Sequence, residues 1–408
     1  MLNWSKQFSI LLLLDSNSNP DNYGAYECLV GAGAYDVLPD GGIDNLRHFH
    51  NERRDWLFGH INYDYKNQLE PRLSSRNNVT IGFPDFFFFI PETVCYITRD
   101  KDALIIETVE KDPQEVYTDI MSNSADIQGE IPGVDFIKRT GRDVYLETVE
   151  KLRTHIRHGD CYEINYCTEG YSGDVNLGPA AVFDALNRLS RAPFSAYYRN
   201  GHRYMMCGSP ERYARKHGDL IISQPIKGTA RRGDTPEADE RIKEQLHLSQ
   251  KDRAENVMIT DLVRNDLARS CETGSIKVEE LFGIYTFPQV HQMISTISGH
   301  LDTDRPFTDV FKYSFPMGSM TGAPKIKVME LIDRYEDARR ELFSGTVGYI
   351  TPGGDFDFNV IIRSLFYNQE KKLLSYQTGG AITYDSNAES EWEEMRLKAW
   401  ALEKIFAG

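Results

Sequence analysis

The 408-residue sequence has no long hydrophobic run and no excess of positive charge. Its two strongest apolar runs, FSILLLL near the N-terminus and FFFFI at 86–90, fall far short of the roughly 20 residues that cross a bilayer. Lysine and arginine number 46 against 61 aspartate and glutamate residues, a net charge of -15 that disfavours binding to nucleic acid. We therefore expect no membrane insertion and no nucleic-acid partner.

Paired cysteines, repeats and nucleotide fingerprints are also missing. The six cysteines form no C-x-x-C pair and match no histidine spacing, so neither a zinc site nor a disulfide framework is indicated. FSILLLL lacks a small-residue cleavage site and runs into DSNSNPDN, which is typical of turns, so it predicts a buried strand rather than a secretion signal. These features favour reduced thiols and a cytoplasmic location. No glycine-rich dinucleotide fingerprint or solenoid repeat is present.

The pattern that is present changes near residue 140. Before it, short strand-like runs alternate with clusters of Pro, Asn, Asp and Gly; after it, long helical patterns alternate with strands. This texture predicts an α+β enzyme fold. We expect a strand-rich part over residues 1–140 and a catalytic part over residues 141–408, interleaved in one globular unit.

Periodicity also places individual elements. It predicts a helix over 142–159, a strand over 161–170, a helical stretch over 236–270 with one break, a hairpin at 353–354 and a final helix over 387–406. Thr235 is the expected N-cap of the long helical stretch. The residues expected to face the core are Val144, Leu152 and Ile156 in the first helix and Trp392, Met395, Ala399 and Leu402 in the last.

One lysine stands out by position. Lys227, in SQPIKGTARRG, follows the apolar run LIIS. Position alone favours a solvated charge at a strand end, and an active-site group is the alternative.

Carboxylates recur at helical spacing on two predicted helices. Asp252 and Glu255 stand three apart on one, and Glu391 and Glu394 stand three apart on the other, with Lys398 one turn further along. Such pairs usually form a solvated face. Two helices that each present two carboxylates can also hold a divalent cation, and Mg²⁺ suits this arrangement because it takes few carboxylates and completes its shell with water and an anionic substrate.

Several ordered motifs carry a resemblance to a known family. SPERY, QPIKGTARRG, DRAENVMITDLVRNDLARS, FPMGSMTGAPKIKVMELI, SGTVGY, DFNVIIRS, TGGAI and EWEEMRLKA follow one another between about residues 140 and 405. This series resembles the chorismate-binding enzymes, which include the anthranilate, aminodeoxychorismate, isochorismate and salicylate synthases. The resemblance implies two packed antiparallel β-sheets with helices on the outside, and chorismate as substrate. In the N-terminal part, LLLLDSN is loosely similar to a strand that carries an amino-acid site in this family.

The resemblance also implies roles for individual residues. It assigns Glu255 and Glu394 as direct Mg²⁺ ligands and Asp252 and Glu391 as acids that reach the metal through water, although Asp252 is shorter than the usual glutamate. Arg363 is expected to clamp a substrate carboxylate through its planar fork. A glycine loop is expected to bring its backbone N–H groups to a carboxylate. The substrate-binding set is completed by Gly379, Gly380 and Ala381 of that loop together with Lys398, Thr229 and Ser319, and His291 is expected near the ring as a further candidate for catalysis.

Lys227 decides the branch within the family. PIKGT resembles the motif of aminodeoxychorismate synthases, in which the lysine is expected to attack C2 of chorismate before ammonia enters at C4. A free amine is needed for this attack, and burial with Arg231 and Arg232 nearby would lower the pKa of Lys227. Glu211 of SPERY matches the expected general acid, the alternative being a surface salt bridge with a neighbouring arginine.

Glu163 departs from the family pattern. Aminodeoxychorismate and anthranilate synthases commonly have glutamine at this position, and the isochorismate branch has a lysine that an acid cannot replace. Glu163 is therefore either a group that binds or deprotonates ammonium, or a structural strand residue. Phe343 stands where anthranilate synthases have a tyrosine that contacts substrate.

Ammonia is expected from a separate glutamine amidotransferase subunit, because the chain has no G-x-C-x-G-type elbow and no room for such a domain. Two alternatives stay open. One is an anthranilate synthase component I, and the other is a non-catalytic protein that binds chorismate without converting it.

Overall fold

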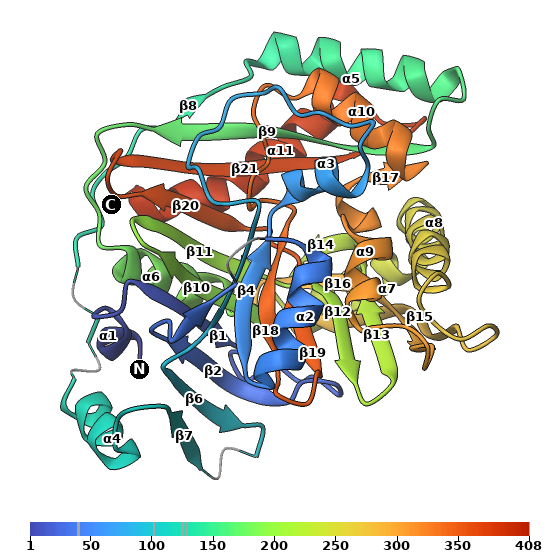
Figure 1. Cartoon of the computed structure of the whole chain (residues 1–408). Helices are drawn as coiled ribbons and strands as arrows, with labels where there is room; N and C mark the ends of the chain where they lie inside the picture. The colour runs from blue at the N-terminus through green and yellow to red at the C-terminus, as the bar shows by residue number, and fades with distance from the viewer. Residues whose placement is uncertain (39–40, 101–102, 124–125, 128, 408) are drawn as a thin grey trace.

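Two large antiparallel β-sheets form the centre of the molecule, and helices lie against their outer faces (Figure 1). The computed structural model describes residues 1–38, 41–100, 103–123, 126–127 and 129–407. The first sheet runs in the order β17 (Gly322–Ala323), β9 (Glu163–Ser172), β21 (Leu373–Ile382), β20 (Ser364–Asn368), β11 (Arg203–Ser209), β10 (Phe194–Asn200), β1 (Ile10–Asp15), β2 (Tyr26–Ala32), β6 (Thr93–Thr98) and β7 (Leu104–Thr108), with β8 (Ile137–Lys138) paired to β9.

The second sheet carries the strand that holds Lys227. Its order is β14 (Ile226–Arg231), β16 (Val290–His300), β13 (Leu220–Gln224), β12 (Arg212–His217), β19 (Phe356–Asn359), β18 (Thr346–Ile350), β4 (Leu57–Ile61), β5 (Phe86–Ile90) and β3 (Asp36–Val37), with β15 (Lys277–Thr286) paired to β16. The first 140 residues contribute strands to both sheets, so the two parts of the sequence share one core.

The helices flank these sheets. They are α1 (Leu2–Ser5), α2 (Ile43–Arg53), α3 (Lys66–Leu69), α4 (Pro113–Ser122), α5 (Arg142–Arg157), α6 (Pro179–Ser190), α7 (Pro236–Leu248), α8 (Gln250–Leu267), α9 (Thr308–Ser314), α10 (Lys325–Tyr335) and α11 (Ala388–Glu403). In Figure 1, α5, α10 and α11 gather at the β9 end of the first sheet, while α7 and α8 cover the β14 end of the second.

The main hydrophobic core lies between the sheets. It joins residues of β1 and β2, such as Leu12 and Leu29, to Phe58 of β4 and Phe358 of β19. The sheets approach closely, because a Cβ added to Gly31 of β2 would lie 2.7 Å from the Phe58 ring. This close packing holds the edges that carry the site in a fixed position.

Most of the expected elements are confirmed. Thr235 caps α7 by accepting from the Ala238 N–H, and the expected break falls at Ser249, which caps α8 by accepting from Asp252. The FSILLLL strand is β1, the hairpin joins β18 to β19, and the final helix is α11 with its four predicted core residues buried. All six cysteines are free.

One predicted core position is wrong. Val144 is 54% exposed, whereas Leu152 and Ile156 are buried as expected. The buried face of α5 begins instead at Tyr145 and continues through Val149, one position further round the helix. Tyr145 fits this face because its ring packs against Trp392 of α11, with ring centroids 5.2 Å apart.

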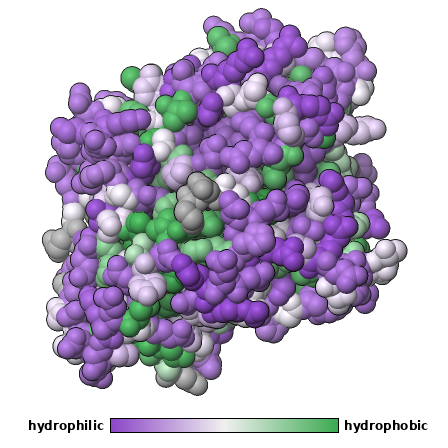
Figure 2. Space-filling view, viewed as in Figure 1, coloured by the Kyte–Doolittle hydropathy of each residue, from purple (hydrophilic) through white to green (hydrophobic). Residues whose placement is uncertain are grey.

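The surface agrees with the composition. The face in Figure 2 is covered mostly by hydrophilic residues, broken by small hydrophobic areas. Among the described residues, no helix combines the length and the apolar character needed to span a membrane.

Candidate active site

Lys227 is buried rather than solvated, and it faces a carboxylate. It lies on β14, and its Nζ is 2.5 Å from Oε1 of Glu163, the first residue of β9. Burial lowers the pKa of Lys227, but the Glu163 carboxylate outweighs burial, and Glu255 and Glu211 add to its effect. The pKa of Lys227 is therefore raised, and the resting side chain is an ammonium ion.

Glu211 is positioned as an acid. It directly precedes β12, and its side chain is buried. Burial raises the pKa of Glu211 to about 7, against the opposing effects of Ser319 and Lys227. Its neighbour Arg212 turns to the other face, so the surface salt bridge is wrong and the expected rise toward neutrality is present.

Helix α8 brings a further acid to Lys227. Burial raises the pKa of Glu255 to about 7, with Lys227 acting in the opposite direction. Glu255 Oε1 is buried without a hydrogen-bond partner and lies 3.9 Å from the Lys251 ammonium. Asp252 packs beside β14, where a Cβ on Gly228 would lie 3.0 Å from the Asp252 Cβ.

Helix α11 presents the second pair of acids. Burial raises the pKa of Glu391, while Lys398, 2.8 Å from Glu394, overcomes burial and lowers the pKa of Glu394. The charge of Lys251 on α8 acts on both acids in the direction that lowers their pKa values, so the two pairs of acids lie within electrostatic range of one another. Lys398 also donates to the Gly379 carbonyl at 2.8 Å.

Arg363 is a further charged residue close to the acids of α11. It precedes β20 with a left-handed backbone at φ 52°, and its charge acts on Glu394. Burial lowers the pKa of the Arg363 guanidinium without discharging it. A half-buried arginine close to Glu394 can bind a carboxylate, the role expected from the sequence.

The glycine segment is a strand rather than a loop. Gly379, Gly380 and Ala381 belong to β21, where they pair with Cys167, Tyr166 and Asn165 of β9. The expected loop is therefore wrong, because the ladder with β9 continues through both glycines. Position 379 still requires glycine, because a Cβ there would lie 2.1 Å from the Tyr166 carbonyl oxygen.

Two predicted residues stand apart. Thr229 is exposed on β14. His291 is buried on β16, where its ring nitrogens contact Asp239 and Thr286 at 2.9 Å each. The structure shows no contact from either of them to Lys227 or Glu211 in the described part of the chain, and their roles stay predictions.

The expected effect of two arginines on Lys227 is wrong. Arg232 pairs with Asp239, and Arg231 is exposed at the end of β14. An extended strand rises about 3.3 Å per residue, so residues four and five positions further on lie more than about 10 Å along the chain. The charges that act on Lys227 come from Glu163, Glu255 and Glu211 on other elements.

The sequence did not predict a buried ion pair that contacts β9. Arg340 pairs with Glu336 at 2.7 Å and donates to the carbonyls of Asn165 and Met320. Glu336 accepts from the Cys167 N–H at 2.9 Å. This pair ties β9 to the segment that carries Ser319; its only trace in the sequence is an acid and an arginine four residues apart.

The comparison with protein families fits this geometry. The sequence matches the family model described as chorismate binding enzyme over residues 41–404. The chain belongs to the chorismate-binding enzymes.

Curated members of the chorismate-binding enzymes align with most of the chain. It is 34% identical to aminodeoxychorismate synthase, chloroplastic, of Arabidopsis thaliana, over 84% of this chain and 39% of that protein. It is 34% identical to aminodeoxychorismate synthase component 1 of Klebsiella aerogenes, over 83% of this chain and 73% of that one. Anthranilate synthase component 1 of Acinetobacter calcoaceticus is 31% identical, over 85% and 73%. The chain thus spans about two-fifths of the Arabidopsis relative.

A solved structure establishes the fold. Anthranilate synthase component I from Streptococcus pneumoniae TIGR4 superposes with a TM-score of 0.82 at 22% identity, covering 94% of this chain and 93% of that one. The expected α+β fold of chorismate-utilising enzymes, with two antiparallel sheets, is confirmed.

The acids also suit the metal that this family implies. Across the described residues no three His, Cys, Asp or Glu side chains gather into a ready-made metal site. Mg²⁺ does not need one, because it binds through one or two carboxylates and fills its shell with water and substrate. Glu255 has an orphaned buried oxygen, and Gly380 leaves a cradle in which a Cβ would lie 3.3 Å from Glu391 Oε2 and 3.8 Å from Glu394 Oε1. The donor set fits Mg²⁺, whose binding stays a prediction.

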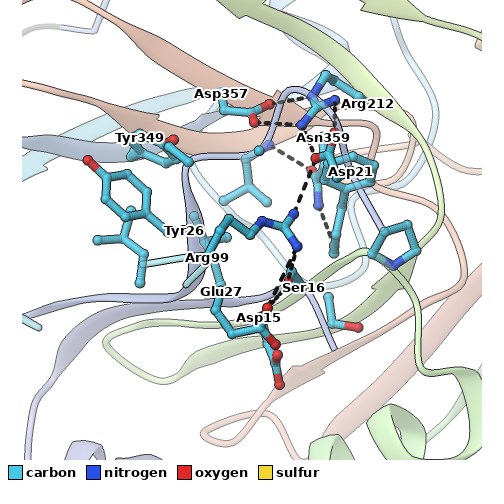
Figure 3. Close-up of a pocket in the computed structure, with 18 residues that line it drawn as sticks. Asp15, Ser16, Asp21, Tyr26, Glu27, Arg99, Arg212, Tyr349, Asp357 and Asn359 are labelled. Carbon is cyan, nitrogen blue, oxygen red and sulfur yellow. Dashed lines mark hydrogen bonds and ion pairs between the residues drawn. The ribbon is translucent and has the colours of Figure 1, made fainter. Parts of the chain in front are cut away.

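A pocket lies beside Arg212, the residue that follows Glu211. It is lined by parts of β1, β2, β18 and β19 and includes the LLLLDSN strand. Figure 3 shows Arg99 and Arg212 both directed toward Asp21, with Arg212 2.6 Å from Asp21 and 2.9 Å from Asp357. The amino-acid site expected in the N-terminal part has a pocket at this place, and its ligand stays a prediction.

Proposed function

We propose that this chain aminates chorismate at C4 as an aminodeoxychorismate synthase component I. The observation that carries the proposal is Lys227, buried within reach of Glu163, Glu211 and Glu255 where the family binds chorismate. A buried lysine beside an acid with a pKa of about 7 supplies a nucleophile and a proton donor.

Substrate binding falls to the cations and the acids of α11 and α8. Arg363 and Lys398 would pair with the carboxylates of chorismate, and Mg²⁺ held by Glu255 and Glu394 would neutralise an anionic carboxylate of the substrate. Charge neutralisation of this kind matters because the acids around Lys227 would otherwise repel a dianion.

Two substitutions make up the reaction. The free amine of Lys227 bonds to C2, the two conjugated ring double bonds shift, and the C4–O bond breaks; Glu211 donates the proton that lets the hydroxyl leave as water. Ammonia then bonds to C4, both double bonds shift back, and the C2–Nζ bond breaks. The new C4 ammonium returns a proton to Glu211. The sum is chorismate plus ammonia giving the amino compound plus water.

A second candidate, anthranilate synthase component I, is supported by the Acinetobacter relative. That reaction places nitrogen at C2 and expels pyruvate, and it has no use for a lysine nucleophile. Lys227 therefore favours C4 amination. Ammonia would come from a glutaminase subunit, a partner in keeping with the component 1 name of the Klebsiella relative.

Product analysis separates these functions. The chain is incubated with chorismate, Mg²⁺ and ammonium salt at mildly alkaline pH, and the products are identified by mass. We expect a product that keeps the enolpyruvyl group and gains nitrogen. Anthranilate with pyruvate would establish the second candidate, and bound but unconverted chorismate would indicate a non-catalytic protein.

A further inference from the structure

Glu163 and Lys227 form a short, buried ion pair in the site. The two side chains are 0% and 9% exposed, and their charged atoms are 2.5 Å apart. Within the described parts of the chain, Glu163 is the carboxylate in ion-pair contact with Lys227. A proton can pass between two such atoms without water.

Other groups that face Lys227 lie further away and have other roles. Glu255 reaches it from α8 and Glu211 from the segment before β12. The charge of Lys227 also acts on the Cys167 thiol of β9. Burial nevertheless raises the pKa of Cys167 to about 12, so the thiol stays neutral. Glu163 is the acid that neither metal binding nor leaving-group protonation uses.

The backbone holds Glu163 in place. It starts β9 and pairs with Ala323 of β17, and the Tyr162 N–H donates to the Ala323 carbonyl at 2.8 Å. Two residues along, the Asn165 amide donates to the Ser319 carbonyl at 2.5 Å. Glu163 Oε2 is buried without a hydrogen-bond partner, so the carboxylate has Lys227 as its polar contact.

Building on the proposed function, we propose that Glu163 takes a proton from Lys227 before Nζ attacks C2, and returns it when the C2–Nζ bond breaks. The Nζ–H bond breaks, its proton bonds to Glu163 Oε1, and the freed electron pair forms the bond to C2. When ammonia has entered C4, the C2–Nζ electron pair returns to nitrogen as a neutral amine. Glu163 then restores the ammonium, and no other reactant is needed.

The test measures covalent capture of chorismate without ammonia. The proposed adduct weighs chorismate minus water, and its rate of formation is followed by intact-protein mass at saturating Mg²⁺ from pH 6 to 9. The useful quantity is the ratio of the wild-type rate to the Glu163→Gln rate, because the Glu211 titration is common to both. We expect a ratio of about 10²-fold or more near pH 6.5. It should shrink about tenfold per pH unit as solvent takes over deprotonation of Lys227.

Glu169→Gln is the matched control. Glu169 is a buried acid on the same strand, but it pairs with Arg139. The ratio of the wild-type rate to the Glu169→Gln rate should not vary with pH. A Glu163→Gln ratio that is equally constant would overturn the role of Glu163 while leaving the lysine mechanism intact. A wild-type chain that forms no adduct would instead refute the nucleophile, and the proton transfer would fall with it.

Folding is checked by thermal unfolding of each variant. If Glu163→Gln does not fold, Glu163→Asp decides the question, because it keeps a carboxylate with a shorter reach. We expect it to lower the rate and keep the wild-type pH profile. A Glu163→Asp profile that climbs tenfold per unit relative to wild type would contradict the proposal.

Discussion

At the scale of residues, the charge of Lys227 is set by carboxylates on other elements. Glu163 is 64 positions away in sequence, yet it makes the closest contact. The result is a lysine that is stored as an ammonium and needs a specific acceptor before it can attack. Burial by itself would favour the free amine, which is available to any electrophile that enters the site.

Glu211 gives a prediction about pH. Burial raises its pKa to about 7, above the ordinary glutamate value, so its proton is retained at acidic pH and lost as the pH rises through about 7. In the proposed reaction the acid form donates to the leaving hydroxyl, so the rate of adduct formation should fall about tenfold per pH unit above that point. Adduct mass measured against pH, at saturating Mg²⁺ and without ammonia, tests this.

Variants of Glu211 sharpen that measurement. Glu211→Gln should lose about 10²- to 10⁴-fold in rate and lose the alkaline fall as well. Glu211→Asp should keep the fall at an altered midpoint. An unchanged alkaline fall in Glu211→Gln would assign the titration to another group.

Sequence predicted these residues better than it predicted their contacts. The ordered motifs brought Lys227, Glu211 and Glu255 together, and the structure places all three in one charged cluster. Arg232 was misjudged because nearness in sequence is not nearness across a strand. The Glu163 contact could not be foreseen, since it depends on how β9 meets β14.

At the scale of elements, α8 and α11 act together. Each carries its acids on one face, and Lys251 lies between them. Helical spacing predicted which acids share a face. It could not predict that the charge of Lys251 on α8 would act on the acids of α11, because that depends on how each helix packs against its sheet.

The metal prediction belongs to these helices. Glu394→Gln should raise the Mg²⁺ concentration for half-maximal chorismate binding by about tenfold or more. Calorimetric titration of chorismate at several Mg²⁺ concentrations measures this. Glu393→Gln is the control, because Glu393 lies next along α11 but pairs with Arg396, whereas Glu394 pairs with Lys398.

Equal Mg²⁺ dependence in the two variants would count against the metal assignment. Glu255→Gln, which changes an acid of α8, should raise the Mg²⁺ concentration for half-maximal chorismate binding in the same way. If only one of the two variants, Glu255→Gln or Glu394→Gln, changes the Mg²⁺ dependence, a single carboxylate holds the ion.

At the scale of the whole molecule, the two sheets explain why the site is dispersed in sequence. The residues to which we assign catalysis and binding come from both sheets and from helices on their outer faces. The texture change near residue 140 predicted strands in the N-terminal part. It did not show that those strands divide between two sheets, since strand pairing over such distances is a property of the folded chain.

The partner prediction applies to the complete assembly. With glutamine and a cognate glutaminase subunit, the rate of chorismate amination should exceed that of the chain alone at the same free ammonia concentration. Such a gain would show that nitrogen passes between the subunits rather than through solvent. Equal rates at matched ammonia would contradict a functional partnership.

The covalent role of Lys227 is the central claim, and one measurement addresses it directly. Three proteins are incubated with chorismate and Mg²⁺ and analysed by peptide mass: wild type, Lys227→Ala and the control Lys216→Ala. Lys216 lies near the C-terminal end of β12 and pairs with Asp355. We expect an adduct of chorismate minus water on Lys227 in wild type and in Lys216→Ala, and a loss of amination of about 10³-fold or more in Lys227→Ala. Full amination by Lys227→Ala, or an adduct on any other residue, would contradict the account.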